Sequence, residues 1–178
     1  MKISEKQFDY AYQEYAKELL HIAYGYTRNK EDSIDIMQNA YVALLESNKK
    51  FESNEHIKYF LIRVTINKSI NFIKSHSYKK VIRNNDYVIN IPETKKEEFP
   101  YDLSEIVSAL PEKYKTIIIL HYYDDMKIKD ISNVLKISES AVKKSLERAR
   151  NLIKEIIERN YKNDWQRVIW IKERLTWV

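Results

Sequence analysis

The chain has 178 residues, 44% of them hydrophobic, which suffices for one medium-sized domain or two small ones. One glycine and no cysteine exclude glycine-rich phosphate-binding loops, disulfides and thiolate metal sites. Lysine and arginine number 31 against 26 acidic residues, and the net charge of +5 moderately favours polyanionic partners. Because three prolines and one glycine leave the chain poor in turn formers, the sequence predicts an all-α fold.

Apolar residues at helical spacing predict three helices in the first part of the chain, over about residues 5–28, 31–46 and 55–75. In the second of these, a step of about 100° per residue separates an inward face from an outward one that carries Asp35 and Asn39. The inward face consists of Ile34, Met37, Ala40, Tyr41, Leu44 and Leu45. The third helix is apolar nearly all round, which predicts that it is buried or covered by a partner.

The periodicity breaks in the middle of the chain, where prolines and a cluster of acidic residues replace the helical pattern. We interpret this segment as a linker between two small helical domains. The predicted division is a first domain at 1–76, the linker at 77–102, a second domain at 103–159 and a C-terminal aromatic extension at 160–178.

The second domain is predicted to contain a helix-turn-helix. A short helix at 103–110 is followed by Pro111, which suits the first turn of the next helix because its missing N–H is unbonded there. A further short helix at 127–135 and a tight turn lead to Ser138, a residue type that caps helix N-termini. Two short helices joined in this way are typical of the motif.

The helix that follows Ser138 carries side chains suited to reading DNA. Its apolar residues line one face, and its opposite arc is polar and cationic. A helix-turn-helix places its second helix in the major groove, where cations neutralise phosphates or donate to guanine. A solvated charged face on an ordinary surface helix is the alternative. The candidate DNA-binding residues are Ser138, Ser140, Lys143, Lys144 and Arg148.

Longer motifs carry a family resemblance. Residues 110–150, LPEKYKTIIILHYYDDMKIKDISNVLKISESAVKKSLERAR, resemble region four of bacterial sigma factors of the extracytoplasmic-function (ECF) group. Residues 31–46 resemble the Asp-Leu-Val-Gln helix of region two through Asp-Ile-Met-Gln at 35–38, and FLIRVTINKSINFIK at 60–74 resembles the helix after it. Both halves occur in the family's order, over about residues 5–159.

The resemblance implies a dissociable subunit that binds core RNA polymerase and directs it to promoter DNA, with an anti-sigma factor as a further partner. It implies no cofactor and no catalytic activity. The outward face of the second helix would bind polymerase through Asp35, Gln38 and Asn39, and the helix after Ser138 would read the minus-thirty-five element. The minus-ten element would be bound and opened by Arg63, Asn67, Lys68, Asn71 and Lys74.

The chain departs from the family pattern at four positions. Asn39 and Asn71 stand where acids are common, and Lys74 stands where arginine is usual. Lys136 stands where a turn glycine is frequent, so we expect it to adopt a left-handed backbone conformation at modest cost. Because of these departures, a promoter preference is not carried over from the family.

Other function classes find less support in the sequence. The four histidines show no metal-ligand spacing and no nucleophile motif is present, so we predict neither a catalytic nor a metal site. No segment has the pattern of a signal peptide or the length of a membrane span, so we expect a cytoplasmic protein without membrane insertion. Two alternatives to a sigma factor stay open: a stand-alone helix-turn-helix regulator that acts without polymerase, and a protein that only binds an anti-sigma factor.

Overall fold

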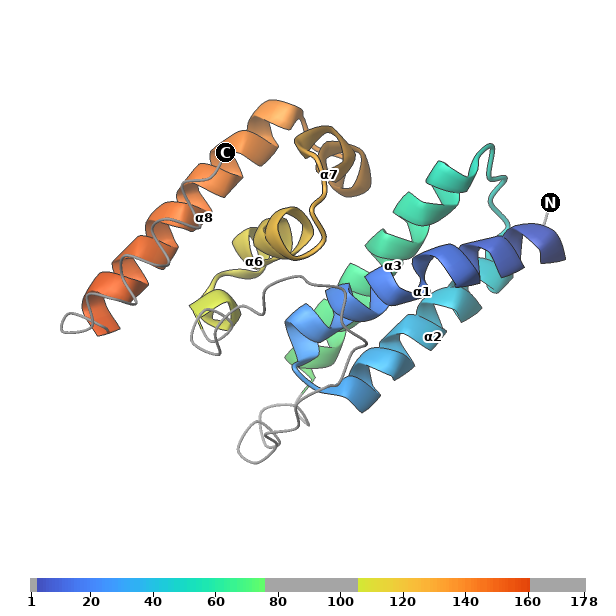
Figure 1. Cartoon of the computed structure of the whole chain (residues 1–178), viewed down its shortest axis with the longest axis horizontal. Helices are drawn as coiled ribbons and strands as arrows, with labels where there is room; N and C mark the ends of the chain where they lie inside the picture. The colour runs from blue at the N-terminus through green and yellow to red at the C-terminus, as the bar shows by residue number, and fades with distance from the viewer. Residues whose placement is uncertain (1–2, 76–105, 161–178) are drawn as a thin grey trace.

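The computed structural model describes residues 3–75 and 106–160, and the predicted all-α fold is confirmed over these residues (Figure 1). The first range contains three helices, α1 (Glu5–Thr27), α2 (Lys30–Glu46) and α3 (Asn54–Lys74). Each of the three packs against the other two, which makes a three-helix bundle. None of the helices in the described ranges is long and apolar enough to cross a membrane.

Side-chain caps explain where the helices of the bundle begin. Ser4 caps α1 in a capping box with Gln7, whose side chain accepts in return from the Ser4 N–H. Asn29 caps α2 and Ser53 caps α3, each accepting a hydrogen bond from a backbone N–H of the first turn. Helix α1 ends at Arg28, whose left-handed conformation (φ 55°) turns the chain into α2. Local sequence therefore sets these boundaries, within one or two residues of the expected ones.

The bundle core confirms most of the predicted inward face of α2. Met37, Ala40, Tyr41 and Leu44 are buried, and α2 packs on α1 and α3. Ile34 is only partly buried, and Ile36, which the prediction did not place on the inward face, is buried as well. Leu45 was predicted to face inward, and this is wrong, because its side chain is 46% exposed. One step beyond Leu44 rotates it by about 100°, out of the stripe that faces the bundle.

The second range forms the helix-turn-helix domain. Residues 106–109 are helical and lead to α6 (Glu112–Ile118), which continues into a π-helical turn, η1 (Ile119–Tyr123). Then follow α7 (Ile128–Leu135) and the long helix α8 (Glu139–Asn160), and α8 packs on α6 and α7. The predicted linker at 77–102 lies outside the described residues, and so does the predicted extension at 160–178 apart from Asn160, which ends α8.

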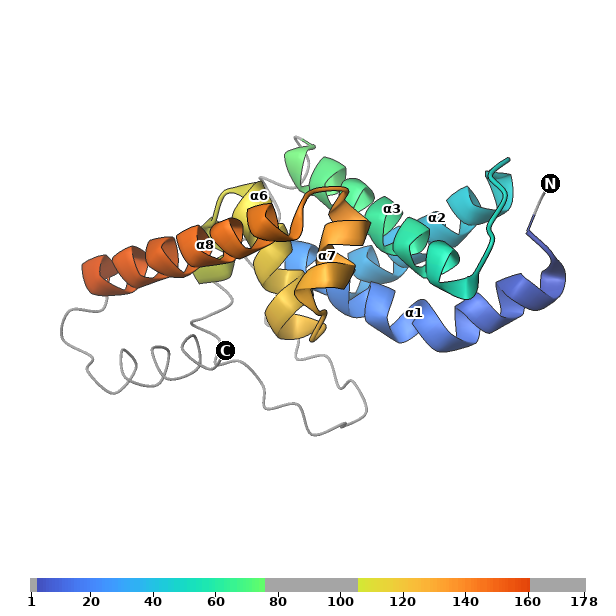
Figure 2. The ribbon, with the colours of Figure 1, turned by 90° about the horizontal axis from the view of Figure 1, so that it is seen from above.

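The two domains are in contact, which the sequence did not predict. Helix α7 lies beside α3 in both views, and the C-terminal end of α1 packs on η1 (Figures 1 and 2). The chain's single glycine, Gly25, lies at this second contact, where an added Cβ would stand 3.0 Å from Cδ1 of Ile119. Next to it, Tyr26 and Thr116 share a buried hydrogen bond of 2.6 Å between their hydroxyls. Gly25 therefore permits a close approach of the Ile119 side chain to α1.

Stability of the bundle is expected to depend on Leu61, which is fully buried in α3. Leu61→Ala removes apolar contacts and leaves a cavity, so the free energy of unfolding in urea is expected to fall by about 2–5 kcal/mol. Val42→Ala serves as the control, because Val42 is 47% exposed and its truncation should change the value by about 0.5 kcal/mol or less. Equal decreases in the two variants would contradict this packing.

Candidate nucleic-acid and polymerase interfaces

The outward face of α8 is formed by the residues that the sequence singled out. Ser138 caps the helix by accepting a hydrogen bond from the N–H of Ala141 at 3.2 Å. On one side of the helix Val142, Leu146, Ala149 and Ile153 are buried, with exposures of 0–1%. The opposite side is exposed and carries Ser138, Ser140, Lys143, Lys144 and Arg148. The amphipathic pattern thus turns two hydroxyls and three cations toward solvent, beginning at the N-terminus of the helix.

A strained turn sets α8 relative to α7. Lys136 adopts the left-handed conformation expected for it, with φ 55° and ψ 45°, and its N–H donates to the carbonyl of Ser132. The Ser132 hydroxyl also donates to the Ile137 carbonyl at 2.6 Å. The first bond satisfies a carbonyl that the end of α7 leaves without an intrahelical partner, and the second ties α7 to the residue before the cap of α8. Together they hold the turn short although Lys136 has a Cβ.

The residues predicted to bind the minus-ten element all lie on α3, and the structure divides them into two groups. Asn67 and Asn71 are exposed and Lys68 is partly exposed. Arg63 and Lys74 instead contact the second domain. Arg63 Nε donates to the carbonyl oxygen of Val134 at 2.8 Å, and Lys74 Nζ lies 3.0 Å from Oε2 of Glu112 in an exposed ion pair.

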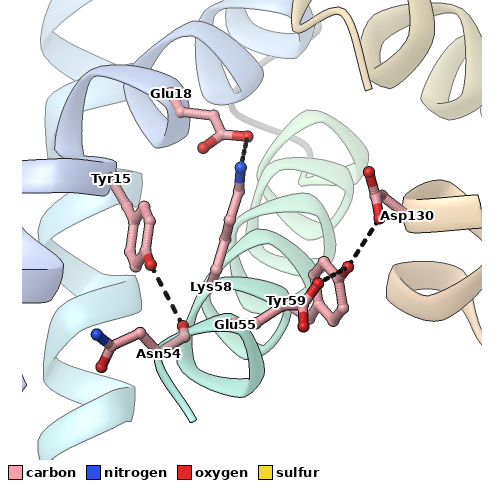
Figure 3. Close-up of polar contacts among 7 residues, drawn as sticks. All are labelled: Tyr15, Glu18, Asn54, Glu55, Lys58, Tyr59 and Asp130. Atoms are coloured by element: carbon pink, nitrogen blue, oxygen red, sulfur yellow. Dashed lines mark hydrogen bonds and ion pairs between the residues drawn. The ribbon is translucent and has the colours of Figure 1, made fainter. Parts of the chain in front are cut away.

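The first turns of α3 are held by polar contacts with two neighbouring helices (Figure 3). On the α1 side, Lys58 Nζ pairs with Glu18 Oε1 at 2.9 Å. On the α7 side, the Tyr59 hydroxyl lies 2.7 Å from Oε1 of Glu55 and 2.9 Å from Oδ1 of Asp130. Burial, together with these carboxylates, raises the pKa of Tyr59 above its ordinary value, so the phenol stays a proton donor.

Helix α2 presents the predicted polymerase-binding residues together on its exposed face. Asp35, Gln38 and Asn39 are all exposed. Val42 and Leu45 continue the same face at the next helical steps and are 47% and 46% exposed. The sequence prediction for this face did not include the apolar pair, and it expected Leu45 to face inward. Val42 and Leu45 follow Gln38 by four and seven residues, and this helical spacing indicates that they share its face.

Comparison with known proteins identifies the family. The family model for Sigma-70 region 2 matches residues 11–78, and the model for Sigma-70, region 4 matches residues 101–153. The chain belongs to the ECF group of the sigma-70 family. It is therefore an RNA polymerase sigma factor, which directs the polymerase to promoters, and the stand-alone regulator is not favoured. Sigma factors are transcription initiation factors and are not known as enzymes.

Several relatives match this sigma factor over most of its length. It is 29% identical over 143 residues to "RNA polymerase sigma factor SigV" of Bacillus subtilis (strain 168), covering 79% of this chain and 85% of that protein. It is 23% identical over 162 residues to "ECF RNA polymerase sigma factor SigM" of the same strain, covering 88% and 98%. Its fold resembles sigma factor RpoE from Bartonella quintana, solved in complex with the anti-sigma factor NepR, with a TM-score of 0.63 and 16% identity over 87% of this chain and 99% of that one.

The strain at Lys136 of the sigma factor gives a testable stability difference. A non-glycine residue in the left-handed region costs about 1–2 kcal/mol of conformational free energy. Glycine avoids this cost, but it loses more conformational entropy on folding, which offsets part of the gain. Lys136→Gly is therefore expected to raise the free energy of unfolding by up to about 1 kcal/mol in a denaturant titration. Lys136→Ala keeps the Cβ and should bring no gain. A gain of the same size in the alanine variant would assign the effect to the removed charge instead.

Proposed function

We propose that this sigma factor divides promoter recognition among three helices: α2 binds core RNA polymerase, α3 binds the minus-ten element and α8 reads the minus-thirty-five element. The observation that carries the proposal is the orientation of α8. Its apolar stripe is buried in the second domain, and its serines and cations face solvent. This orientation is the one that a helix needs to enter a major groove while its domain stays folded.

On α8 the proposed contacts differ along the helix. Ser138 and Ser140 lie at the N-terminus, where a recognition helix approaches the base edges and hydroxyls either donate or accept. Lys143, Lys144 and Arg148 lie further along on the exposed side, and their charges neutralise phosphates and release counterions. The serines therefore act in base contacts, and the cations supply the salt-dependent affinity.

On α3 the proposed ligand is a melted DNA strand. Asn67 and Asn71 offer exposed amides one turn apart, and Lys68 supplies a partly exposed charge between them. Arg63 and Lys74 extend the cationic line in both directions along the helix. A single strand needs cations along its backbone and groups that interact with unstacked bases, and this helix provides the charged and amide parts of that set.

On α2 the proposed partner is the polymerase. Asp35, Gln38 and Asn39 form the polar part of its exposed face, and Val42 and Leu45 extend that face with apolar area. An anti-sigma factor is proposed as a competing partner, supported by the similar fold of RpoE in its complex with NepR. Since polymerase and promoter DNA are the partners of a sigma factor, we place the protein in the cytoplasm.

The polymerase role is tested by transcription in vitro. With core RNA polymerase, the full chain is expected to co-elute and to give a run-off transcript from one site in the DNA upstream of its own gene. A variant with Asp35→Ala and Gln38→Ala should bind core enzyme about tenfold more weakly, because both side chains lie on the docking face. Gln13→Ala with Glu14→Ala is the matched control, since it likewise removes one carboxylate and one glutamine from exposed positions, here on α1. Co-elution that the α2 substitutions leave unchanged would refute the α2 assignment, and the absence of any specific transcript would refute the proposal as a whole.

The minus-thirty-five role is tested by salt-dependent binding of duplex DNA. Replacing Lys143, Lys144 and Arg148 by glutamine should weaken binding. The slope of log affinity against log salt should become shallower by about 0.9 for each phosphate that is no longer neutralised. Fluorescence anisotropy with an upstream promoter duplex over a range of salt concentrations measures both quantities.

The control for this experiment removes three exposed lysines of the first domain, by Lys6→Gln, Lys30→Gln and Lys50→Gln. It changes the net charge by the same amount but leaves α8 intact, so its effect on the slope should be small. An α8 variant with the affinity and slope of the control would exclude this face as the DNA-binding surface.

A further inference from the structure

The exposed face of α8 carries an acidic residue among the cations that we assign to DNA. Glu147 is exposed, and it follows Lys143 by four residues and Lys144 by three. These spacings make the three side chains neighbours on the helix surface. A carboxylate on a face that neutralises phosphates repels the same phosphates, so it weakens the attraction to every duplex. Its place on this face therefore needs a physical reason.

Contacts within the protein do not supply that reason. Within the part of the chain that the structure describes, the Glu147 carboxylate makes no hydrogen bond and no ion pair. Glu158 of the same helix, in contrast, pairs with Lys154 at 3.9 Å. Glu139 lies in the first turn, where the helix dipole favours an acid, but Glu147 lies about two turns further along, beyond the reach of that field.

Helical geometry places Glu147 on the part of α8 that would face the base edges. Successive residues are about 100° apart, so Glu147 lies about 20° from Ser140 around the helix and about two turns along from it. Lys143 lies about 40° from Glu147 on one side, and Lys144 about 60° on the other. Cations therefore flank Glu147 on both sides, in the directions of the two phosphate backbones that border a groove.

A carboxylate distinguishes between base edges because it only accepts hydrogen bonds. In the major groove cytosine presents an amino donor, guanine and thymine present acceptors, and adenine presents a donor beside an acceptor. Cytosine is therefore the base that suits Glu147, and guanine or thymine in its place would set acceptor against acceptor. An unpaired charge that is unfavourable on the wrong partner is a recognised source of specificity.

We propose that Glu147 is a specificity-determining residue of the minus-thirty-five contact, where it accepts a hydrogen bond from the N4 amino group of one cytosine. This inference rests on the proposed role of α8. The surrounding cations supply affinity for any duplex, and Glu147 lowers the affinity for duplexes that lack cytosine at that position. It is the one acid among the exposed residues between positions 140 and 151 of α8.

Selection from a pool of duplexes with randomised central base pairs tests this assignment. The full-length chain is expected to prefer cytosine at one position by at least about fivefold over the other bases. Glu147→Ala should lose this preference and keep the preferences at the other positions. Glu147→Gln should replace it by a preference for adenine, because a glutamine amide both donates and accepts and matches N6 and N7 of adenine. Sequencing of the bound duplexes measures each preference.

Glu155→Gln is the matched control. Glu155 is exposed on the same side of α8, about 12 Å further along the helix, and its substitution removes the same charge. This variant should keep the cytosine preference. Because guanine presents only acceptors in the major groove, a preference for a cytosine–guanine pair that depends on a carboxylate is assigned to the cytosine.

Affinity for the unselected pool gives a second measurement, made by fluorescence anisotropy. It should rise in both Glu147 variants, because the repulsion between the carboxylate and the phosphates is removed from an exposed position. This rise also shows that the variants are folded. A fall would contradict the repulsion on which the inference rests.

The outcomes separate this inference from the role of α8. Unchanged preferences in both Glu147 variants would overturn the inference and leave α8 as the DNA-binding helix, and so would the loss of preference for a base other than cytosine. Equal loss of the cytosine preference in Glu155→Gln would assign the effect to net charge and overturn the inference too. If the unmodified chain enriches no sequence, the proposed reading of the minus-thirty-five element fails, and the role of Glu147 fails with it.

Discussion

Helix α3 is apolar on nearly all sides, and such a helix is unstable wherever water reaches its surface. Burial of Ile57, Leu61 and Ile62 against α1 and α2 forms the bundle, but these helices cover only part of the circumference. Helix α7 covers a further part. The need to cover α3 therefore assembles the first domain and also brings the second domain against it. The helix that we assign to the minus-ten element is for this reason also the helix at the domain boundary.

The two proposed DNA-binding helices show how one chemical requirement is met in different surroundings. Both need cations that face outward. On α8 a single buried stripe leaves a wide exposed arc, so Lys143, Lys144 and Arg148 face solvent while the helix stays packed. On α3 apolar residues leave little free surface, and its cations lie at the margins, where Arg63 meets α7. This difference explains why a proposed DNA-binding residue of α3 contacts the other domain, whereas those of α8 face solvent.

Backbone conformation is as important as side-chain chemistry at two positions. Gly25 lies within a regular helix, so its backbone conformation does not require glycine. What matters there is the absence of a Cβ, which lets Ile119 approach α1. Lys136 presents the opposite case, because a residue with a Cβ holds a conformation that favours glycine. Its N–H still donates to the Ser132 carbonyl, and the turn keeps its form at the cost of some strain.

The sequence alone determined the helices, the amphipathic face of α8, the left-handed turn at Lys136 and the family, because these depend on residues a few positions apart or on motifs that are read in order. Only the tertiary structure decided which partners Tyr59 and Arg63 take, since Asp130 and Val134 are each 71 positions away. It also decided that Leu45 faces solvent and that α6 passes into a π-helical turn. Helical periodicity indicates which side of a helix is apolar. The extent to which neighbouring helices cover that side depends on packing between segments that are distant in the sequence. A local sequence pattern does not contain this information.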